Sequence, residues 1–88
     1  MRALSVSKSA KRKIEAFLKK QPALRSKVER VIGVLLQDTF SAGLDTHKLS
    51  GKLGYLYSAS ITYEYRIVFY FDTDTVYIVN IGSHEEVY

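Results

Sequence analysis

The sequence contains no cysteine, so it can form neither a disulfide framework nor a thiolate metal site. This composition suits a reducing cytosol. No stretch approaches the roughly 20 consecutive apolar residues that a membrane span requires. The beginning, MRALSVSKSAKRK, has no apolar run typical of a signal peptide. We therefore expect a soluble, cytoplasmic protein that does not enter a membrane.

Several catalytic motifs are also missing. The two histidines, His47 and His84, do not have the spacing of a metal-ligand pair. The segment GKLG at 51–54 is too short for a phosphate-binding loop and does not lead into a helix. No serine stands on a nucleophile elbow. The sequence therefore predicts no metal and no cofactor, and it leaves metal-free acid–base chemistry as the remaining class.

The 88 residues have room for one domain, which we place at 1–88. The net charge of +4 is unevenly distributed. Residues 1–30 hold ten of the thirteen lysines and arginines against two glutamates, a net +8, so the remainder carries −4. Clustered basic residues indicate a polyanionic partner, either nucleic acid or an acidic protein segment. A solvated helix face explains the same cluster, and both interpretations stay open.

The first half of the chain predicts a short strand followed by two helices. Leu4 and Val6 alternate with polar residues, which is typical of a half-buried strand. Residues 8–20 repeat apolar residues with helical spacing, and Pro22 then ends this helix and starts a second one that reaches Asp38. The two helices should form a hairpin.

Residues 39–54 contain three glycines and no sustained period, so we expect a loop that carries His47. Aromatic and β-branched residues then predict strands at 55–61, 65–71 and 76–81, most simply an antiparallel meander. The predicted fold is α+β: a small antiparallel sheet, made of the N-terminal strand and the meander, with the helix hairpin on one face.

Arg66 lies in the central strand of this meander. Alternation directs the more apolar set, Tyr65, Ile67, Phe69 and Phe71, towards the helices. Arg66 would then lie on the open face, where its planar, permanently charged fork suits a phosphate. Pairing with Glu64 or another acid across the strands remains an alternative.

The remaining candidate groups could transfer a phosphoryl group within RNA without a metal. The RNA 2′-hydroxyl needs a base, the phosphate oxygens need positive charge, and the departing 5′-oxygen needs an acid. Two histidines, Glu64, Arg66 and a tyrosine offer these groups, and the ending IGSHEEVY brings His84 and Tyr88 close in sequence. The alternative is that both histidines are ordinary surface residues.

Three segments, HKLSG, YRIVF and IGSHEEVY, give the chain a family resemblance over nearly its whole length. Together they resemble the RelE/ParE toxin superfamily, in particular the RelE-like and YafQ-like mRNA interferases. The resemblance implies a small twisted antiparallel sheet with two helices on one face. It also implies ribosome-dependent cleavage of mRNA by 2′-hydroxyl attack, which leaves a 2′,3′-cyclic phosphate and a 5′-hydroxyl and stops translation.

By position, the resemblance makes His84 the general acid and matches His47 to the loop histidine of YafQ-like enzymes. It makes Arg66 the group that stabilises the phosphate, Glu64 a base or the residue that orients one, and Tyr88 a substrate-positioning aromatic. We expect the tail to fold back so that His84 and Tyr88 face Arg66.

Ser60 replaces a histidine of YafQ-like enzymes, and it can donate a hydrogen bond but cannot act as a base at neutral pH. Glu64 or His47 would then have to be the base. Our candidate RNA-binding residues are Lys8, Lys11, Arg12, Lys13, Lys48, Lys52 and Ser60.

The resemblance leaves two other functions open. One is a ParE-like toxin that inhibits DNA gyrase without catalysis, and the other is a catalytically weak member that mainly binds an antitoxin. The expected partners are a cognate acidic antitoxin, the ribosome with its rRNA, and mRNA.

Overall fold

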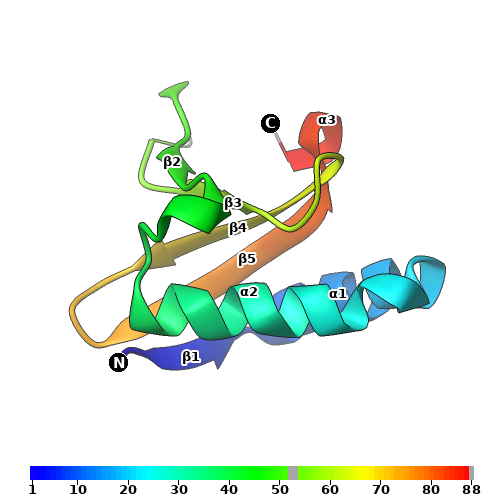
Figure 1. Ribbon diagram of the computed structural model, residues 1–88, viewed down its shortest axis with the longest axis horizontal. Coiled ribbons are helices and arrows are strands. Elements are labelled where there is room, and N and C mark those ends of the chain that lie inside the picture. Colours follow the sequence, from blue (N-terminus) through cyan, green and yellow to red (C-terminus); the bar gives the residue numbers. More distant parts are fainter. Residues whose placement is uncertain (52–53, 88) are drawn as a thin grey trace.

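The computed structural model describes residues 1–51 and 54–87. The predicted strand, helix pair and three later strands are all present (Figure 1). The elements in order are β1 (Ala3–Val6), α1 (Lys8–Lys20), the 3-10 turn η1 (Pro22–Leu24), α2 (Arg25–Gln37), the 3-10 turn η2 (Ala42–Leu44), β2 (His47–Lys48), β3 (Tyr57–Ser60), β4 (Tyr65–Phe71), β5 (Thr75–Ser83) and α3 (His84–Val87).

The five strands form one sheet in the order β1-β5-β4-β3-β2. The meander β3–β4–β5 is antiparallel, as predicted. In contrast, β1 runs parallel to β5, from the pair Ala3↔Thr75 to Val6↔Ile78, so the sheet is mixed rather than wholly antiparallel. Alternation of side chains shows that a segment is a strand but contains no information about the direction of a partner so far along the chain. The predicted loop also contains a fifth strand, β2, which pairs with β3.

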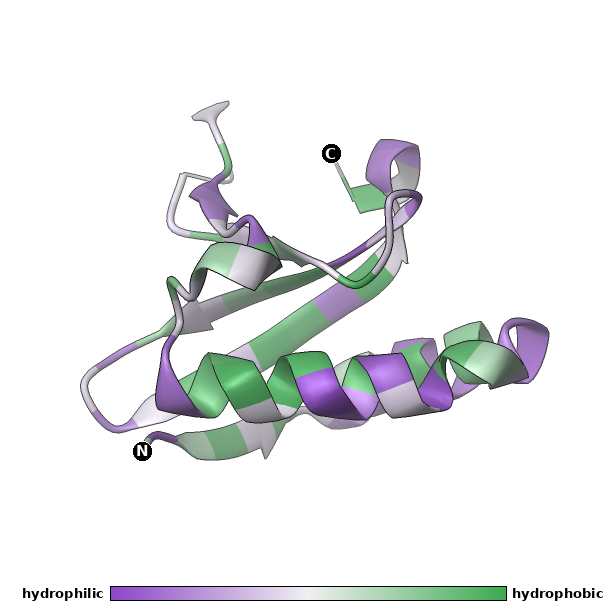
Figure 2. Cartoon of the chain, in the orientation of Figure 1, coloured by the Kyte–Doolittle hydropathy of each residue, from purple (hydrophilic) through white to green (hydrophobic). Residues whose placement is uncertain are grey.

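Helices α1 and α2 cover one face of the sheet (Figure 1). Ser7 begins α1, because its hydroxyl oxygen accepts a hydrogen bond from the Ala10 N–H at 3.1 Å. Apolar residues run along β4 and β5, whereas hydrophilic and apolar residues alternate along the helices (Figure 2). The helix-side core therefore comes from both layers: Leu18, Val28, Val31, Leu35, Leu44, Ala59, Ile61, Ile67, Phe69, Val76, Ile78 and Ile81.

The opposite face carries a second, smaller apolar cluster of Leu49, Leu56, Val68 and Val87. Strand β2 and helix α3 project on this side of the sheet, away from α1 and α2 (Figure 1). Because Val87 is buried, the end of the described chain is docked on the sheet rather than frayed. No helix in the described ranges is long and apolar enough to span a lipid bilayer.

The β4–β5 turn is held by Asp72. Its Oδ1 accepts hydrogen bonds from the N–H groups of Asp74 and Thr75 at 2.9 and 2.8 Å, and its Oδ2 accepts one from the Tyr77 hydroxyl at 3.1 Å. The two backbone N–H donors stabilise the carboxylate and lower the pKa of Asp72. The bond to this carboxylate raises the pKa of Tyr77. The turn therefore favours an ionised Asp72 beside a protonated Tyr77.

Candidate active site

Arg66 lies on the face of β4 opposite the helices, as its place in the alternation predicts. Its side chain, however, is buried instead of open to solvent, with 7% of the residue exposed. Its Nε donates to the Ser58 hydroxyl at 3.0 Å, and its Nη2 donates to the Asp45 carbonyl at 2.7 Å. Its Nη1 lies 3.4 Å from the Asp45 carboxylate. The acid that pairs with Arg66 is therefore Asp45 and not Glu64.

Asp45 reaches Arg66 because the backbone turns sharply after η2. Asp45 has a φ of 48°, in the left-handed region that aspartate tolerates better than most residues. This conformation lets its carbonyl and its carboxylate both bond to the guanidinium. Ser58 is fully buried in β3, where its register partner is Val68. Asp45 and Ser58 are the two site residues that sequence analysis missed.

His47 is next to this arginine. It begins β2 opposite Ser58, and its Nδ1 lies 3.2 Å from the Asp45 carbonyl and 3.5 Å from the Arg66 Nη2. A carbonyl only accepts hydrogen bonds, so the shorter contact is satisfied when Nδ1 carries the proton, which puts the basic lone pair on Nε2. The His47 imidazole is exposed, so Nε2 belongs to a surface side chain that lies beside the buried Arg66 guanidinium.

The backbones of His84 and Glu64 meet where β4 begins and β5 ends, close to Arg66 in the register. The N–H of His84, the first residue of α3, donates to the Glu64 carbonyl at 3.1 Å. Both side chains are exposed. Register pairs Arg66 with Gly82, and the strand order places Arg66 between β2, which carries His47, and β5, which leads into His84. The two histidines therefore lie on either side of Arg66.

The prediction that the tail folds back over the sheet is tested only in part. Val87 packs against Leu49, Leu56 and Val68 on the face that holds Arg66. Tyr88 lies outside the described residues, so its expected position facing Arg66 stays a prediction.

Ser60 is the register partner of Arg66 in β3. Its hydroxyl donates to the Thr62 carbonyl at 2.9 Å, within the turn that leads to β4. Its proton is therefore directed towards the protein's own backbone, although Ser60 was expected to donate to RNA.

The candidate RNA-binding residues fall in separate places. Lys8, Lys11, Arg12 and Lys13 are exposed on α1, which packs on the face opposite Arg66. Lys48 is exposed in β2, next to His47, and Lys52 lies outside the described residues. The basic helix and the Arg66 site therefore face different directions, and among the described candidates Lys48 is the one that lies beside the site.

The described ranges hold no group of three or more histidines, aspartates or glutamates placed to bind a metal ion. The chemistry that the site offers is that of a fixed guanidinium with the His47 imidazole 3.5 Å away, and with His84 in the segment that follows the neighbouring strand β5.

No protein-family model matches the chain. No curated protein matches it by sequence either. Solved structures do match. YafQ from Escherichia coli has a TM-score of 0.83 at 12% identity, over 100% of this chain and 99% of that one. A metal-bound toxin from Helicobacter pylori has a TM-score of 0.81 at 21% identity, over 100% of both chains.

The YoeB dimer from Staphylococcus aureus has a TM-score of 0.78 at 19% identity, over 94% of this chain and 97% of that chain. YafQ has also been solved as a complex with DinJ, and its chain there matches with a TM-score of 0.81. The resemblance drawn from the sequence is confirmed at the level of architecture. This chain has the RelE/YafQ-like toxin fold.

Proposed function

We propose that this protein is the toxin of a bacterial toxin–antitoxin system and an endoribonuclease that cuts mRNA on the ribosome in the cytoplasm. One observation carries the proposal: the buried Arg66 guanidinium lies 3.5 Å from the His47 imidazole, on the face that α3 and His84 border. A fold shared with YafQ and YoeB toxins supports the same function.

Each histidine carries out one of the two proton transfers, His47 as the base and His84 as the acid. With its Nδ1 proton donated to the Asp45 carbonyl, His47 takes the 2′-hydroxyl proton on Nε2. The 2′-oxygen then forms a bond to phosphorus while the bond from phosphorus to the 5′-oxygen breaks. Protonated His84 donates a proton to that departing oxygen. The products are a 2′,3′-cyclic phosphate and a 5′-hydroxyl, with no metal and no net consumption of protons.

Arg66 supplies positive charge for the phosphate oxygens as the pentacoordinate phosphorus forms. Two of its nitrogens, Nε and Nη2, are anchored by Ser58 and by the Asp45 carbonyl. Among the described residues, the third nitrogen, Nη1, makes a long 3.4 Å contact to a carboxylate whose side chain is 76% exposed. A substrate phosphate can displace this carboxylate while the guanidinium stays in place. The Asp45 carboxylate thus occupies the position beside Nη1 at which a phosphate oxygen would bind.

The other candidates have supporting roles. Glu64 positions His84, because its carbonyl accepts the N–H of that residue. Lys48 contacts the RNA backbone beside His47, and Tyr88 stacks on the substrate. The α1 residues Lys8, Lys11, Arg12 and Lys13 point away from Arg66, so we assign them to ribosomal RNA, with binding that weakens as salt rises.

A cognate antitoxin is the proposed protein partner. YafQ forms a complex with DinJ, which motivates the same kind of partner for this chain. The net charge of +8 over residues 1–30 favours an acidic segment of that antitoxin.

Primer extension on an mRNA translated in a purified system tests the proposal. The wild-type protein should produce discrete cuts that require ribosomes. His84→Gln and His47→Gln should each cut about 10²–10⁴-fold more slowly, which is the usual contribution of a general acid or base. Glu29→Gln, an exposed change on α2, is the matched control and should cut at the wild-type rate.

Intact mRNA together with arrested growth would contradict the proposal and direct attention to DNA gyrase. Intact mRNA with normal growth would favour the second candidate, a member that binds its antitoxin but barely cuts. The internal hydrogen bond of Ser60, which turns its proton away from RNA, is the observation that favours this second candidate.

A further inference from the structure

One backbone oxygen contacts both the imidazole of His47 and the guanidinium of Arg66. The carbonyl of Asp45 accepts a hydrogen bond from the Arg66 Nη2 at 2.7 Å and lies 3.2 Å from the His47 Nδ1. These two nitrogens are 3.5 Å apart. When Nδ1 carries a proton, both nitrogens are donors and cannot bond to each other. Because a carbonyl oxygen has two lone pairs, it can accept from both and hold the two groups side by side.

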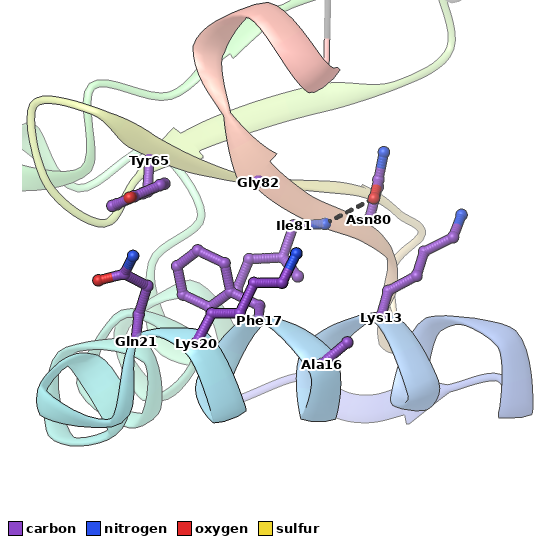
Figure 3. Close-up of a pocket in the computed structure, with 9 residues that line it drawn as sticks. All are labelled: Lys13, Ala16, Phe17, Lys20, Gln21, Tyr65, Asn80, Ile81 and Gly82. Carbon is purple, nitrogen blue, oxygen red and sulfur yellow. Dashed lines mark hydrogen bonds between the residues drawn. The ribbon is translucent and has the colours of Figure 1, made fainter.

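The backbone at Arg66 is fixed from both faces of the sheet. The preceding residue, Tyr65, points to the helix side, where its ring packs edge to face on Phe17 at 5.0 Å beside a cavity of about 410 Å³ (Figure 3). On the other face, the Arg66 Nε donates to the buried Ser58 hydroxyl at 3.0 Å. His47 lies instead in β2, an exposed strand of two residues at the edge of the described sheet. The position of its imidazole relative to the guanidinium therefore depends on the residues that lead into β2.

Asp45 is held in a left-handed conformation, with φ 48° and ψ 46°. Its N–H donates to the Ala42 carbonyl at 3.5 Å. The preceding Leu44 is buried in the helix-side core, and the following Thr46 hydroxyl donates to the Thr39 carbonyl at 2.7 Å. Between these two anchors, a right-handed or extended residue would direct its carbonyl elsewhere. Most residues with a Cβ avoid the left-handed region, whereas aspartate, asparagine and glycine accept it.

We infer, on the basis of the proposed function, that Asp45 is a positioning residue whose left-handed backbone, and not its carboxylate, performs this role. By accepting from Nδ1, its carbonyl keeps the basic lone pair of His47 on Nε2. By accepting from Nη2, the same oxygen holds the guanidinium that meets the phosphate. The base comes from an exposed strand and the cation from a buried one, and this oxygen sets the distance between them.

Glycine and alanine at position 45 separate the backbone from the carboxylate. Both remove the carboxylate, but glycine adopts the left-handed conformation freely and alanine does not. Asp45→Gly and Asp45→Asn should therefore cut mRNA at least as fast as the wild type. Asp45→Ala should cut about 5–30-fold more slowly than Asp45→Gly, the population ratio that a left-handed penalty of this kind produces. Primer extension with ribosomes, corrected for the folded fraction, measures these rates.

Nitrogen NMR of the full chain without ribosomes measures the tautomer of His47. With ¹⁵N-labelled histidine, above the pH at which the imidazoles titrate, the chemical shifts show which ring nitrogen carries the proton. The sequence has two histidines, so a His84→Gln sample assigns the signals. The proton should be on Nδ1 of His47 in the wild type, Asp45→Gly and Asp45→Asn. In Asp45→Ala, part of the population should move it to Nε2.

Gly51→Ala is the matched control. Gly51 also has a left-handed φ, of 68°, and an added methyl group there would meet no described heavy atom within 4 Å. Alanine at this position therefore brings the same kind of backbone penalty without removing the carbonyl of Asp45. It should lower the thermal midpoint, while His47 keeps its proton on Nδ1.

A wild-type His47 protonated on Nε2 would overturn the inference, because Arg66 would then donate to Nδ1 directly. Equal cleavage and equal tautomers in Asp45→Ala and Asp45→Gly would also overturn it, as would loss of the Nδ1 proton in Gly51→Ala. The NMR measurement needs no cleavage. The expected tautomers in a protein that leaves mRNA intact would refute the nuclease function, whereas cleavage with the other tautomer would refute the role of Asp45 alone.

Discussion

The two faces of the sheet are built differently. Among the described residues, the helix-covered face holds twelve buried apolar residues. Eleven of them come from α1, α2, η2 and three strands, and the twelfth is Ile61, just after β3. The opposite face buries four apolar residues beside a fully buried Ser58 and a guanidinium. Burial of a cation is costly unless hydrogen bonds and charge compensate it, and Asp45 and Ser58 provide both for Arg66. One face therefore stabilises the fold, and the other holds polar groups at fixed positions.

Phe69 and Val68 are neighbours in β4 that point to opposite faces. The losses of stability on substituting each of them therefore compare the contributions of the two faces. Phe69→Ala should lower the free energy of unfolding by about 3–5 kcal/mol, because it leaves a cavity in the larger core. Val68→Ala should cost about 1–2 kcal/mol, because it removes less apolar surface. Urea denaturation measures both. Equal losses would show that the two faces contribute alike to stability.

Substitution of Arg66 tests whether the face of the sheet that carries Arg66 and Ser58 takes part in catalysis. Arg66→Gln should reduce ribosome-dependent cleavage about 10²–10³-fold, since it removes the charge that faces the phosphate. Arg66→Lys should rescue little, because an ammonium cannot keep the bonds to Ser58 and Asp45 at once.

Loss of stability in Arg66→Gln should stay at about 1–3 kcal/mol, the usual cost of losing hydrogen bonds to a charged group. Cleavage rates corrected for the folded fraction separate the two effects. A variant that cuts normally would place the phosphate elsewhere.

Substitution of Val87 tests how strongly α3 is held on the face of the sheet that carries Arg66 and Ser58. Val87→Ala should cost about 1–2 kcal/mol and increase amide hydrogen exchange in α3 before the rest of the sheet. Glu85→Ala, at an exposed position of the same helix, should change exchange little. Fast exchange in both variants would mean that Val87 does not hold the helix.

The smallest effect concerns pH and the β4–β5 turn. The folded pKa of Asp72 is below its ordinary 3.8, so its stabilisation is present above that value and is lost as pH falls through the folded pKa. The folded pKa of Tyr77 is above its ordinary 10.0, so its stabilisation is present below that value and is lost as pH rises through the folded pKa.

Asp72→Asn should therefore have a lower thermal midpoint than the wild type at neutral pH. The difference between the two midpoints should shrink in acid, where the stabilisation by Asp72 is lost. Melting curves from acid to alkaline pH measure this difference. A constant difference at every pH would contradict the assignment.

Sequence patterns predicted the elements well because local rules set them. Helical spacing, Pro22 and strand alternation identified α1, α2 and the meander, and alternation assigned Arg66 to the correct face. The burial of Arg66 was not predictable, because Asp45 and Ser58 reach it through a left-handed turn and a strand register that no local pattern encodes. The parallel direction of β1 and the pairing of β2 depend equally on distant contacts. Histidine spacing likewise did not show that His47, and not Glu64, meets the arginine.

The pairing of β1 with β5 also constrains the order of events during synthesis. Arg2 donates to the carbonyl of Asp72, 70 residues later, and β5 is the one strand of the described residues that pairs with β1. At about 5–20 residues per second, a ribosome takes roughly 4–14 s to add the residues between them. Until β5 emerges, β1 has no edge to join, and closing so long a loop is among the slower steps in folding. The sheet therefore cannot be completed before β5 (Thr75–Ser83) has been made and has left the ribosome.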